Sequence, residues 1–313
     1  MKSLTTILCP PIAMIGLLMS GAARADDPPA PAPSSDVVGN PSAPVSRLDS
    51  GRLLLTQGIS NVEGASGGGL ATWATIAGYG TRNAIGGNVH FTYVGTPQYG
   101  LKDYGIAIGF YDRLELSYTR QNFDTGKTGA LLGLGQGFTF NQDVFGAKLK
   151  LFGDAVYDQN RILPQVAVGV QYKHNDKAAI IQAVGGKHND GTDFYIAATK
   201  VFLDQSLVVD ATLRFTKANQ TGLLGFGGDR GDKYKPEFEG SIGYLLTKKL
   251  VVGAEFRTKP NNLGFAKEDA WYDVFAAYTL NKHLSLTAAY TDLGSIATFK
   301  GQRGVFLSLQ AGL

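Results

Sequence analysis

The chain lacks the cysteines that would cross-link a secreted fold and, beyond its N-terminal region, the long apolar runs of a helical membrane protein. Cys9 is the only cysteine among the 313 residues, so no disulfide can form within the chain. No run of eighteen apolar residues follows the N-terminal region, and the mean hydropathy is only −0.04. These two features argue against a transmembrane helix in the rest of the sequence.

The sequence shows neither a marked excess of one charge sign nor a spacing of residues typical of a metal site. The 29 Lys and Arg residues nearly balance the 26 Asp and Glu residues, so nothing indicates a nucleic-acid surface. The four histidines, His90, His174, His188 and His283, are scattered and show no ligand spacing. We therefore expect no metal, no cofactor and no nucleic-acid partner.

The N-terminal region is typical of an exported protein. Lys2, the apolar stretch Ile12–Leu18 and the small-residue site Ala23-Arg24-Ala25 predict a secretory signal over residues 1–25. Residues 26–50 are rich in Pro, Ala and Ser and lack the apolar residues that would offset ordering entropy, so we expect a disordered periplasmic lead. Residues 51–313 then form the folded part.

Apolar and polar residues alternate within the stretch Pro236–Arg257. Its two halves, on either side of the turn Thr247–Lys249, each carry apolar residues on one parity and mostly polar or small residues on the other. Side chains of a strand point to opposite faces with period two, so this stretch predicts a hairpin with one apolar face. Each half is about ten residues long with aromatics toward its ends, as a tilted membrane-crossing strand requires.

The same alternation recurs along the chain and fixes an expected strand number. Clear segments include Ile85–Val94, Asp103–Phe110 and Arg303–Leu313. The stretches Leu53–Val62 and Leu70–Tyr79 are weaker; counting both as strands gives about 14 strands, and omitting them gives about 12. The sequence leaves open whether Leu53–Val62 belongs to a wall or lies inside it as a plug.

Short and long connections alternate between these segments. The short ones include Tyr111–Arg113 and Asn281–His283, and the long ones include Asn122–Gln142 and Ala218–Lys235. Outer-membrane barrels combine short periplasmic turns with long extracellular loops, and closure leaves no unpaired strand edge in lipid. We therefore predict an all-β fold, a single antiparallel up-and-down transmembrane barrel in the outer membrane of a Gram-negative bacterium. Outer-membrane lipid, lipopolysaccharide and the barrel-assembly machinery are its expected partners.

A soluble β-sandwich is the competing interpretation, because it also has one apolar face. The long strands, the aromatics near strand ends and the many Gly, Ala and Ser residues on the polar parity favour the membrane barrel.

The block from Gly51 to Arg82, GRLLLTQGISNVEGASGGGLATWATIAGYGTR, resembles the opening of a proteobacterial family of unknown function, number 3034. The resemblance extends through the barrel to Leu313. It implies an outer-membrane barrel with no assigned activity, and it brings no functional residues with it.

Eleven charged residues fall on the parity that would face the lumen, six acidic and five basic. A ring of one sign gives ion selectivity, so this mixture predicts weak selectivity or pairing across the interior. About twelve to fourteen strands lie between filled eight-stranded barrels and open porins, which predicts a narrow or plugged pore. The lumen-facing candidates are Glu115, Lys148, Lys150, Lys173, Asp210, Arg214, Glu237, Glu239, Glu255, Arg257 and Asp273.

Two long loops carry similar apolar, glycine-rich tips, Leu131–Gly135 and Leu223–Gly227. One hypothesis is that these tips narrow the mouth or contact a hydrophobic solute; the other is that they pack on each other or dip into lipopolysaccharide. The mouth-loop candidates are Leu131, Leu132, Leu134, Leu223, Leu224 and Phe226.

Three functions are compatible with these features. We expect a passive, narrow, porin-like channel for small solutes that performs no chemistry. The alternative is a filled barrel with a structural or surface-interaction role. A hydrolase at the outer rim, built around His188, is a third possibility, but no catalytic constellation stands out.

Overall fold

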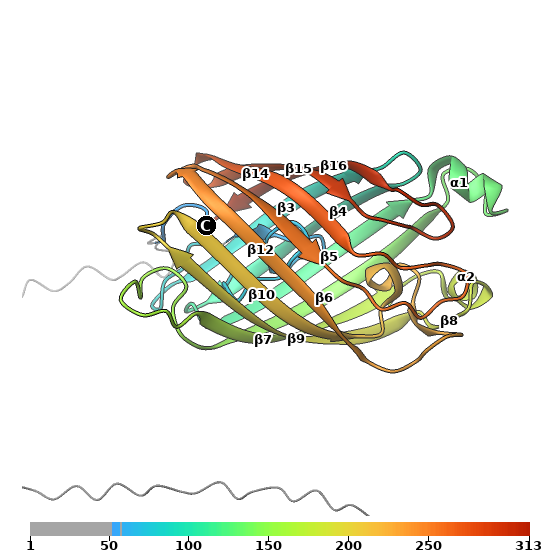
Figure 1. The fold of residues 1–313 in the computed structure, drawn as a ribbon, viewed down its shortest axis with the longest axis horizontal. Coiled ribbons are helices and arrows are strands. Elements are labelled where there is room, and N and C mark those ends of the chain that lie inside the picture. The colour runs from blue at the N-terminus through green and yellow to red at the C-terminus, as the bar shows by residue number, and fades with distance from the viewer. Residues whose placement is uncertain (1–51, 57) are drawn as a thin grey trace, which may run out of the picture. The chain divides into compact units, whose positions relative to one another are not determined.

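The strands of the computed structural model close into a barrel, shown in Figure 1. The structure describes residues 52–56 and 58–313; the predicted signal and Pro-rich lead lie outside the described residues. Twelve strands pair antiparallel with their neighbours, and β16 pairs with β3 to close the ring. They are β3 (Ile85–Gly95), β4 (Gly100–Phe110), β5 (Leu114–Asp124), β6 (Thr139–Phe152), β7 (Gln165–Asn175), β9 (Asp190–Phe202), β10 (Leu207–Thr216), β12 (Lys235–Thr247), β13 (Leu250–Arg257), β14 (Trp271–Asn281), β15 (Leu284–Asp292) and β16 (Arg303–Gly312).

The connections differ at the two ends of the barrel. The short-turn end carries residues 111–113, 153–164, 203–206, 248–249 and 282–283. The long-loop end carries residues 96–99, 125–138, 176–189, 217–234, 258–270 and 293–302. Between residues 81 and 313, the helices and the strands that do not belong to the wall all lie in the long loops: α1 (Gly126–Leu131), α2 (Ala178–Ala183), the 3-10 turn η1 (Asn219–Gly222), β8 (Gly186–His188) and β11 (Phe226–Gly228). In Figure 1 the labels α1, α2 and β8 lie at the right-hand end of the barrel.

The predicted alternation is confirmed along the wall. On β12, Ile242 and Tyr244 are exposed on the outer face, whereas Glu239 and Ser241 are buried on the lumen face. Consecutive residues of a strand face opposite sides, so one parity forms an apolar outer surface and the other lines the interior. The all-β barrel with short turns and long loops is therefore as expected.

The main expectation of about fourteen strands is wrong, and the alternative of about twelve is right. Leu53–Val62 and Leu70–Tyr79 are not wall strands. All of residues 58–80 that the structure describes are buried on both parities, which a wall strand facing lipid does not allow. Within them only a short hairpin forms, from β1 (Ile59–Ser60) and β2 (Ser66–Gly67). This inner segment, residues 58–80, lies inside the barrel.

Candidate functional site: a filled lumen beneath an apolar chamber

The inner segment fits against the wall because the facing wall positions carry glycine. A Cβ placed on Gly109 would lie 2.2 Å from the Ala77 carbonyl oxygen, and one on Gly86 would lie 2.3 Å from the Gly80 nitrogen. Real side chains do not fit at those distances, so glycine is required wherever the two backbones approach this closely. This close approach accounts for Gly86 on β3 and Gly109 on β4.

The acidic side chains of the lumen bind backbone N–H groups of the inner segment. Leu70 N–H donates to Glu255 Oε2 (2.7 Å), and Thr72 N–H donates to Glu239 Oε2 (2.8 Å). Ser66 and Ala77 donate their N–H groups to the two oxygens of Glu115, at 3.1 and 2.8 Å. Irregular buried backbone needs partners for its polar groups, and here wall carboxylates replace a neighbouring strand.

Basic and neutral donors of the wall satisfy the carbonyl groups of the same segment. Lys148 Nζ donates to Ser66 O (3.0 Å) and Thr75 O (2.9 Å). Arg257 Nη1 donates to Leu70 O (3.2 Å), and Gln165 Nε2 donates to Ala74 O (2.7 Å). The acidic side chains of the lumen therefore accept from the N–H groups of the inner segment, and the basic side chains donate to its C=O groups.

Glu63 places one negative charge at the centre of the filled lumen. Its Oε1 pairs with Lys173 Nζ, and its Oε2 lies 2.9 Å from Arg257 Nη2 and 3.6 Å from Arg214 Nη2. The Glu63 side chain has no exposed surface. A buried carboxylate that loses its cation partners is strongly destabilised, so these three cations hold Glu63 and the segment around it.

Wall carboxylates complete this charge network. Asp193 Oδ2 lies 2.6 Å from Lys173 Nζ, and Glu239 Oε1 lies 2.5 Å from Arg214 Nε and 3.4 Å from Arg257 Nε. Three cations therefore face three carboxylates, including Glu63, inside the barrel. The network ties β7, β9, β10, β12 and β13 to the inner segment.

The structure buries ten of the eleven lumen-facing candidates and leaves Glu237 partly exposed near the long-loop end. Glu115, Lys148, Lys173, Arg214, Glu239, Glu255 and Arg257 gather around the inner segment. Asp210 and Asp273 lie beside that group, and Lys150 lies apart from it. Asp210 accepts from Thr199, Asp273 is opposite Glu255 in the β13–β14 register, and Lys150 pairs with Asp112 (2.6 Å) at the short-turn end.

Sequence reasoning missed Glu63 and Asp193 as members of the site. Glu63 had a signal of its own, since it is the only charged residue between Arg52 and Arg82. A single carboxylate in a long uncharged stretch needs a cationic partner from another part of the chain or from a second molecule. Asp193 lies where the strand parity of 194–202 could not be fixed from the sequence.

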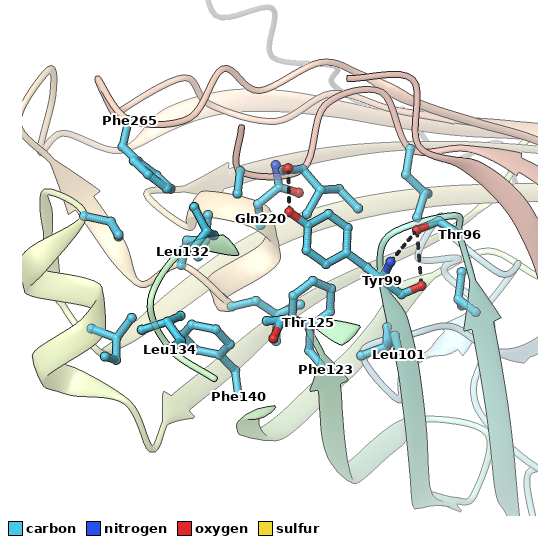
Figure 2. Close-up of a pocket in the computed structure, with 18 of the residues that line it drawn as sticks. Thr96, Tyr99, Leu101, Phe123, Thr125, Leu132, Leu134, Phe140, Gln220 and Phe265 are labelled. Carbon is cyan, nitrogen blue, oxygen red and sulfur yellow. Dashed lines mark hydrogen bonds between the residues drawn. The ribbon is translucent and has the colours of Figure 1, made fainter. Parts of the chain in front are cut away.

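An apolar chamber of about 210 Å³ lies above the inner segment, toward the long-loop end. Its floor is formed by Val62 and Leu70 of that segment. Figure 2 shows Leu101 and Phe123, at the ends of wall strands, on one side of the chamber, and Leu132 and Phe265, from the long loops, on the other. The apolar wall residues are Val94, Leu101, Phe123, Phe140 and Trp271, and the apolar loop residues are Tyr99, Leu132, Leu134, Ile180, Ala183, Val184, Leu223, Leu224, Phe265, Leu293, Ile296 and Ala297.

Aromatic packing and hydrogen bonds fix the polar groups of the chamber. The ring of Tyr99 stacks on Phe123 with centroids 5.2 Å apart, and its hydroxyl donates to Ile296 O (3.2 Å). Burial raises the pKa of Tyr99 to about 12, so this hydroxyl stays protonated. Thr96 donates to Gln302 Oε1 (2.9 Å), and Thr125 donates to Phe138 O (2.7 Å).

A buried ion pair braces the loops that roof the chamber. Lys259 Nζ lies 2.9 Å from Glu268 Oε2 and donates to Gln220 Oε1 (3.1 Å), while Glu268 Oε1 accepts from Gln220 N–H (2.8 Å). Burial lowers the pKa of Lys259 and raises that of Glu268, each against the charge of its partner. Loops 217–234 and 258–270 are thereby fixed to each other.

The structure brings four of the six mouth-loop candidates together. Leu132, Leu134, Leu223 and Leu224 all line the chamber. Leu131 instead points away, with 75% of its surface exposed. Phe226 is fully buried on β11, where its ring fills the space that a side chain on Gly191 would occupy.

His90 lies buried in the wall, with its Nε2 3.2 Å from Asp103 Oδ1, away from the rim that carries His188. His188 is exposed on β8, and no described nucleophile hydrogen-bonds to its ring. Among the same residues, no group of His, Cys, Asp and Glu side chains is arranged to hold a metal ion. No described helix has both the length and the apolar character needed to cross a membrane.

The closed antiparallel wall, its apolar outer face and its long-loop end define a porin-like β-barrel of the outer-membrane type. The family model described as "Protein of unknown function (DUF3034)" matches residues 56–310, and the chain belongs to this family. The resemblance seen at residues 51–82 is thus confirmed. Comparison with curated proteins gives no match.

Solved structures with a similar fold include porins, a channel and an enzyme, the outer membrane phospholipase A from Escherichia coli, which is 11% identical with a TM-score of 0.38 over 72% of this chain and 92% of that chain. The KdgM porin is 11% identical with a TM-score of 0.47, over 72% of this chain and 98% of that chain. The NanC porin is 10% identical with a TM-score of 0.46, over 72% and 97%. The COG4313 outer membrane channel from Pseudomonas putida F1 is 13% identical with a TM-score of 0.44, over 73% and 94%.

Proposed function

We propose that the protein is a passive, narrow channel for small solutes in the outer membrane of a Gram-negative bacterium, and that the inner segment is its gate. The long-loop end faces outward, the apolar outer surface contacts lipid and lipopolysaccharide, and the barrel-assembly machinery inserts the chain. The wall catalyses no reaction in this proposal. Solute enters the apolar chamber and continues when the inner segment shifts.

One observation carries the proposal: the inner segment is held to the wall largely by hydrogen bonds and ion pairs. Backbone N–H groups such as those of Leu70 and Thr72 bond to wall side chains, not to a continuous strand. Water can replace such bonds at a small net cost for each one, whereas a strand of the wall is held by a full ladder. The segment is therefore the part of the interior best suited to move.

A filled barrel with a structural or surface role is the second candidate. The buried inner segment favours it, because residues 58–80 occupy space that an open pore would need. The two candidates differ in whether the segment ever leaves its place.

A reversible disulfide between the segment and the wall separates them. Ser60 Oγ donates to Asn88 Oδ1 at 3.0 Å, so the double variant Ser60→Cys/Asn88→Cys places two thiols near each other. Planar-bilayer conductance and solute flux into liposomes are measured before and after reduction. We expect little conductance when the disulfide is formed and wild-type steps after reduction.

The matched control is Thr92→Cys/Ser308→Cys, which joins two directly paired wall residues whose hydroxyls are 2.9 Å apart. This disulfide does not tether the inner segment, so it should leave conductance unchanged. Equal conductance in the oxidised and reduced Ser60/Asn88 variant would refute gating by the segment. Persistent silence of every form, wild type included, would establish the filled barrel instead.

A further inference from the structure

We propose that the apolar chamber binds one small, uncharged, predominantly apolar molecule of one or two rings. This inference rests on the proposed channel and names the class of its solute. It is argued from the size of the chamber, its lining and its position directly above the inner segment.

The size of the chamber sets the size of its occupant. Its volume is about 210 Å³. A cavity of about 150 Å³ lined by Leu, Ile and Phe stays free of water and takes up benzene in another protein. The larger space here suits a substituted benzene or a two-ring hydrocarbon, and it is too small for an oligosaccharide.

The lining offers almost nothing to a charged or strongly polar molecule. The side chains of Thr96, Tyr99, Thr125 and Gln220 all line the chamber, and each is already hydrogen-bonded within the protein. A polar solute would lose its water without gaining partners, which is unfavourable. An apolar solute loses nothing and gains burial.

Of the lining residues that the structure describes, Trp271 is the one that offers a ligand an unused hydrogen-bond donor, and it narrows the class of ligand. Its indole N–H is buried and, among the described residues, has no hydrogen-bond acceptor. Its ring lies beneath the Lys259 ammonium, 4.5 Å from the centroid. Buried indole N–H groups usually find a partner, so a ligand carrying one ether, carbonyl or hydroxyl oxygen would complete this position.

The position of the chamber connects binding to the gate. Leu70 forms part of the floor, and its backbone is held by Glu255 and Arg257. The chamber also adjoins a buried apolar cluster that continues along β13–β16 through Phe306, Phe275 and Val251 and reaches Leu55 and Ile59 of the N-terminal part. A bound apolar molecule therefore contacts the segment that must move, at the start of a continuous apolar stripe.

The experiment uses Trp271 as the reporter. The chain contains only two tryptophans, so Trp73→Phe leaves Trp271 as the only one. The purified barrel in detergent is titrated with bromobenzene, a heavy-atom quencher, and with the anion 4-bromobenzoate. We expect saturable quenching at one molecule per barrel for bromobenzene, and only weak, non-saturable quenching for the anion.

Two variants in that background locate the binding. Leu223→Phe fills the chamber and should weaken saturable quenching at least about tenfold, because the added atoms take the space that the ligand needs. Leu307→Phe adds the same atoms on the exposed outer face and should change nothing. Ile180→Phe is a second filling variant, and retarded migration of unheated samples on a gel confirms folding in each case.

Quenching that never saturates in the reference, or that is equal in the Leu223 and Leu307 variants, would overturn the binding site. Such a result leaves the channel itself standing if the disulfide experiment shows gated flux. Conversely, saturable binding without gated flux would retain the site and reject the channel.

Discussion

Replacing Glu63 by glutamine tests what holds the inner segment in the lumen. The change keeps the shape of the side chain and removes a charge that lies 2.9 Å from Arg257 and 3.6 Å from Arg214 and also pairs with Lys173. Breaking a buried ion pair by removing one partner costs about 3–5 kcal/mol. If that cost falls on docking of the segment, its released fraction rises about 10²- to 4 × 10³-fold, since 1.4 kcal/mol is tenfold.

Hydrogen exchange reads this change directly. The N–H groups of Leu70, Thr72, Ala74 and Ala77 donate to wall side chains, so they exchange only when the segment leaves the wall. In Glu63→Gln these amides should exchange faster by about the factor given above, while amides of the wall strands keep their protection. Conductance steps should also become more frequent.

Two controls accompany this variant. Asp143→Asn removes a carboxylate that pairs with Arg120 (2.9 Å) on the partly exposed outer surface, and it should leave the inner amides unchanged. Glu63→Gln/Lys173→Gln restores the charge balance and should return part of the protection. A folded Glu63→Gln barrel with unchanged exchange of these four amides would refute the claim that Glu63 anchors the segment.

Two other substitutions probe the remaining attachments. Gly109→Val would drive a side chain into the Ala77 carbonyl oxygen and should speed exchange of the Ala77 amide. Gly100→Val is the control, because a side chain there has no neighbour closer than 3.9 Å, and it should leave that exchange unchanged. Equal exchange of the Ala77 amide in both variants would contradict the close-packing argument. Lys148→Met removes the donors to Ser66 O and Thr75 O and should lower the midpoint of urea unfolding. The control is Lys200→Met, because the native Lys200 ammonium donates to loop carbonyls at the short-turn end. Hydrogen exchange of the inner-segment amides should become faster in the Lys148 variant and stay unchanged in the Lys200 variant.

Most of the wall could be predicted from the sequence, because an apolar outer face and a filled interior impose a period of two. The parity of Ile242 against Ser241 is visible in any ten residues of β12, and it needs no knowledge of distant contacts. About fourteen strands is the first choice from the sequence because Leu53–Val62 and Leu70–Tyr79 both count as strands there, and Leu70–Tyr79, with its Trp73, has the composition of one. Its true environment is set by wall side chains that are far away in the sequence, such as Glu239 and Ser241.

The candidate site was predictable in part for the same reason. Parity identified Lys173 and Arg214 as inward-facing, but it does not say that they meet at Glu63. The chamber depends on loops 125–138, 176–189 and 217–234 folding over the mouth, and their repeated Leu-Gly tips predicted apolar contact without predicting its partners. Trp271, on the inward parity of β14, contributes an apolar surface where the pattern indicated a polar one.

The path of the inner segment has a consequence for the proposed opening of the channel. Arg52 pairs with Asp112 at the short-turn end, and Tyr79 N–H donates to Leu313 O (2.8 Å) at that same end. Between these points the chain rises to the chamber floor at Val62 and Leu70. The chain from Arg52 to Gly80 thus enters the lumen at the short-turn end and leaves it at the same end. Such a loop can withdraw without any strand separating and without a chain end being pulled through the pore.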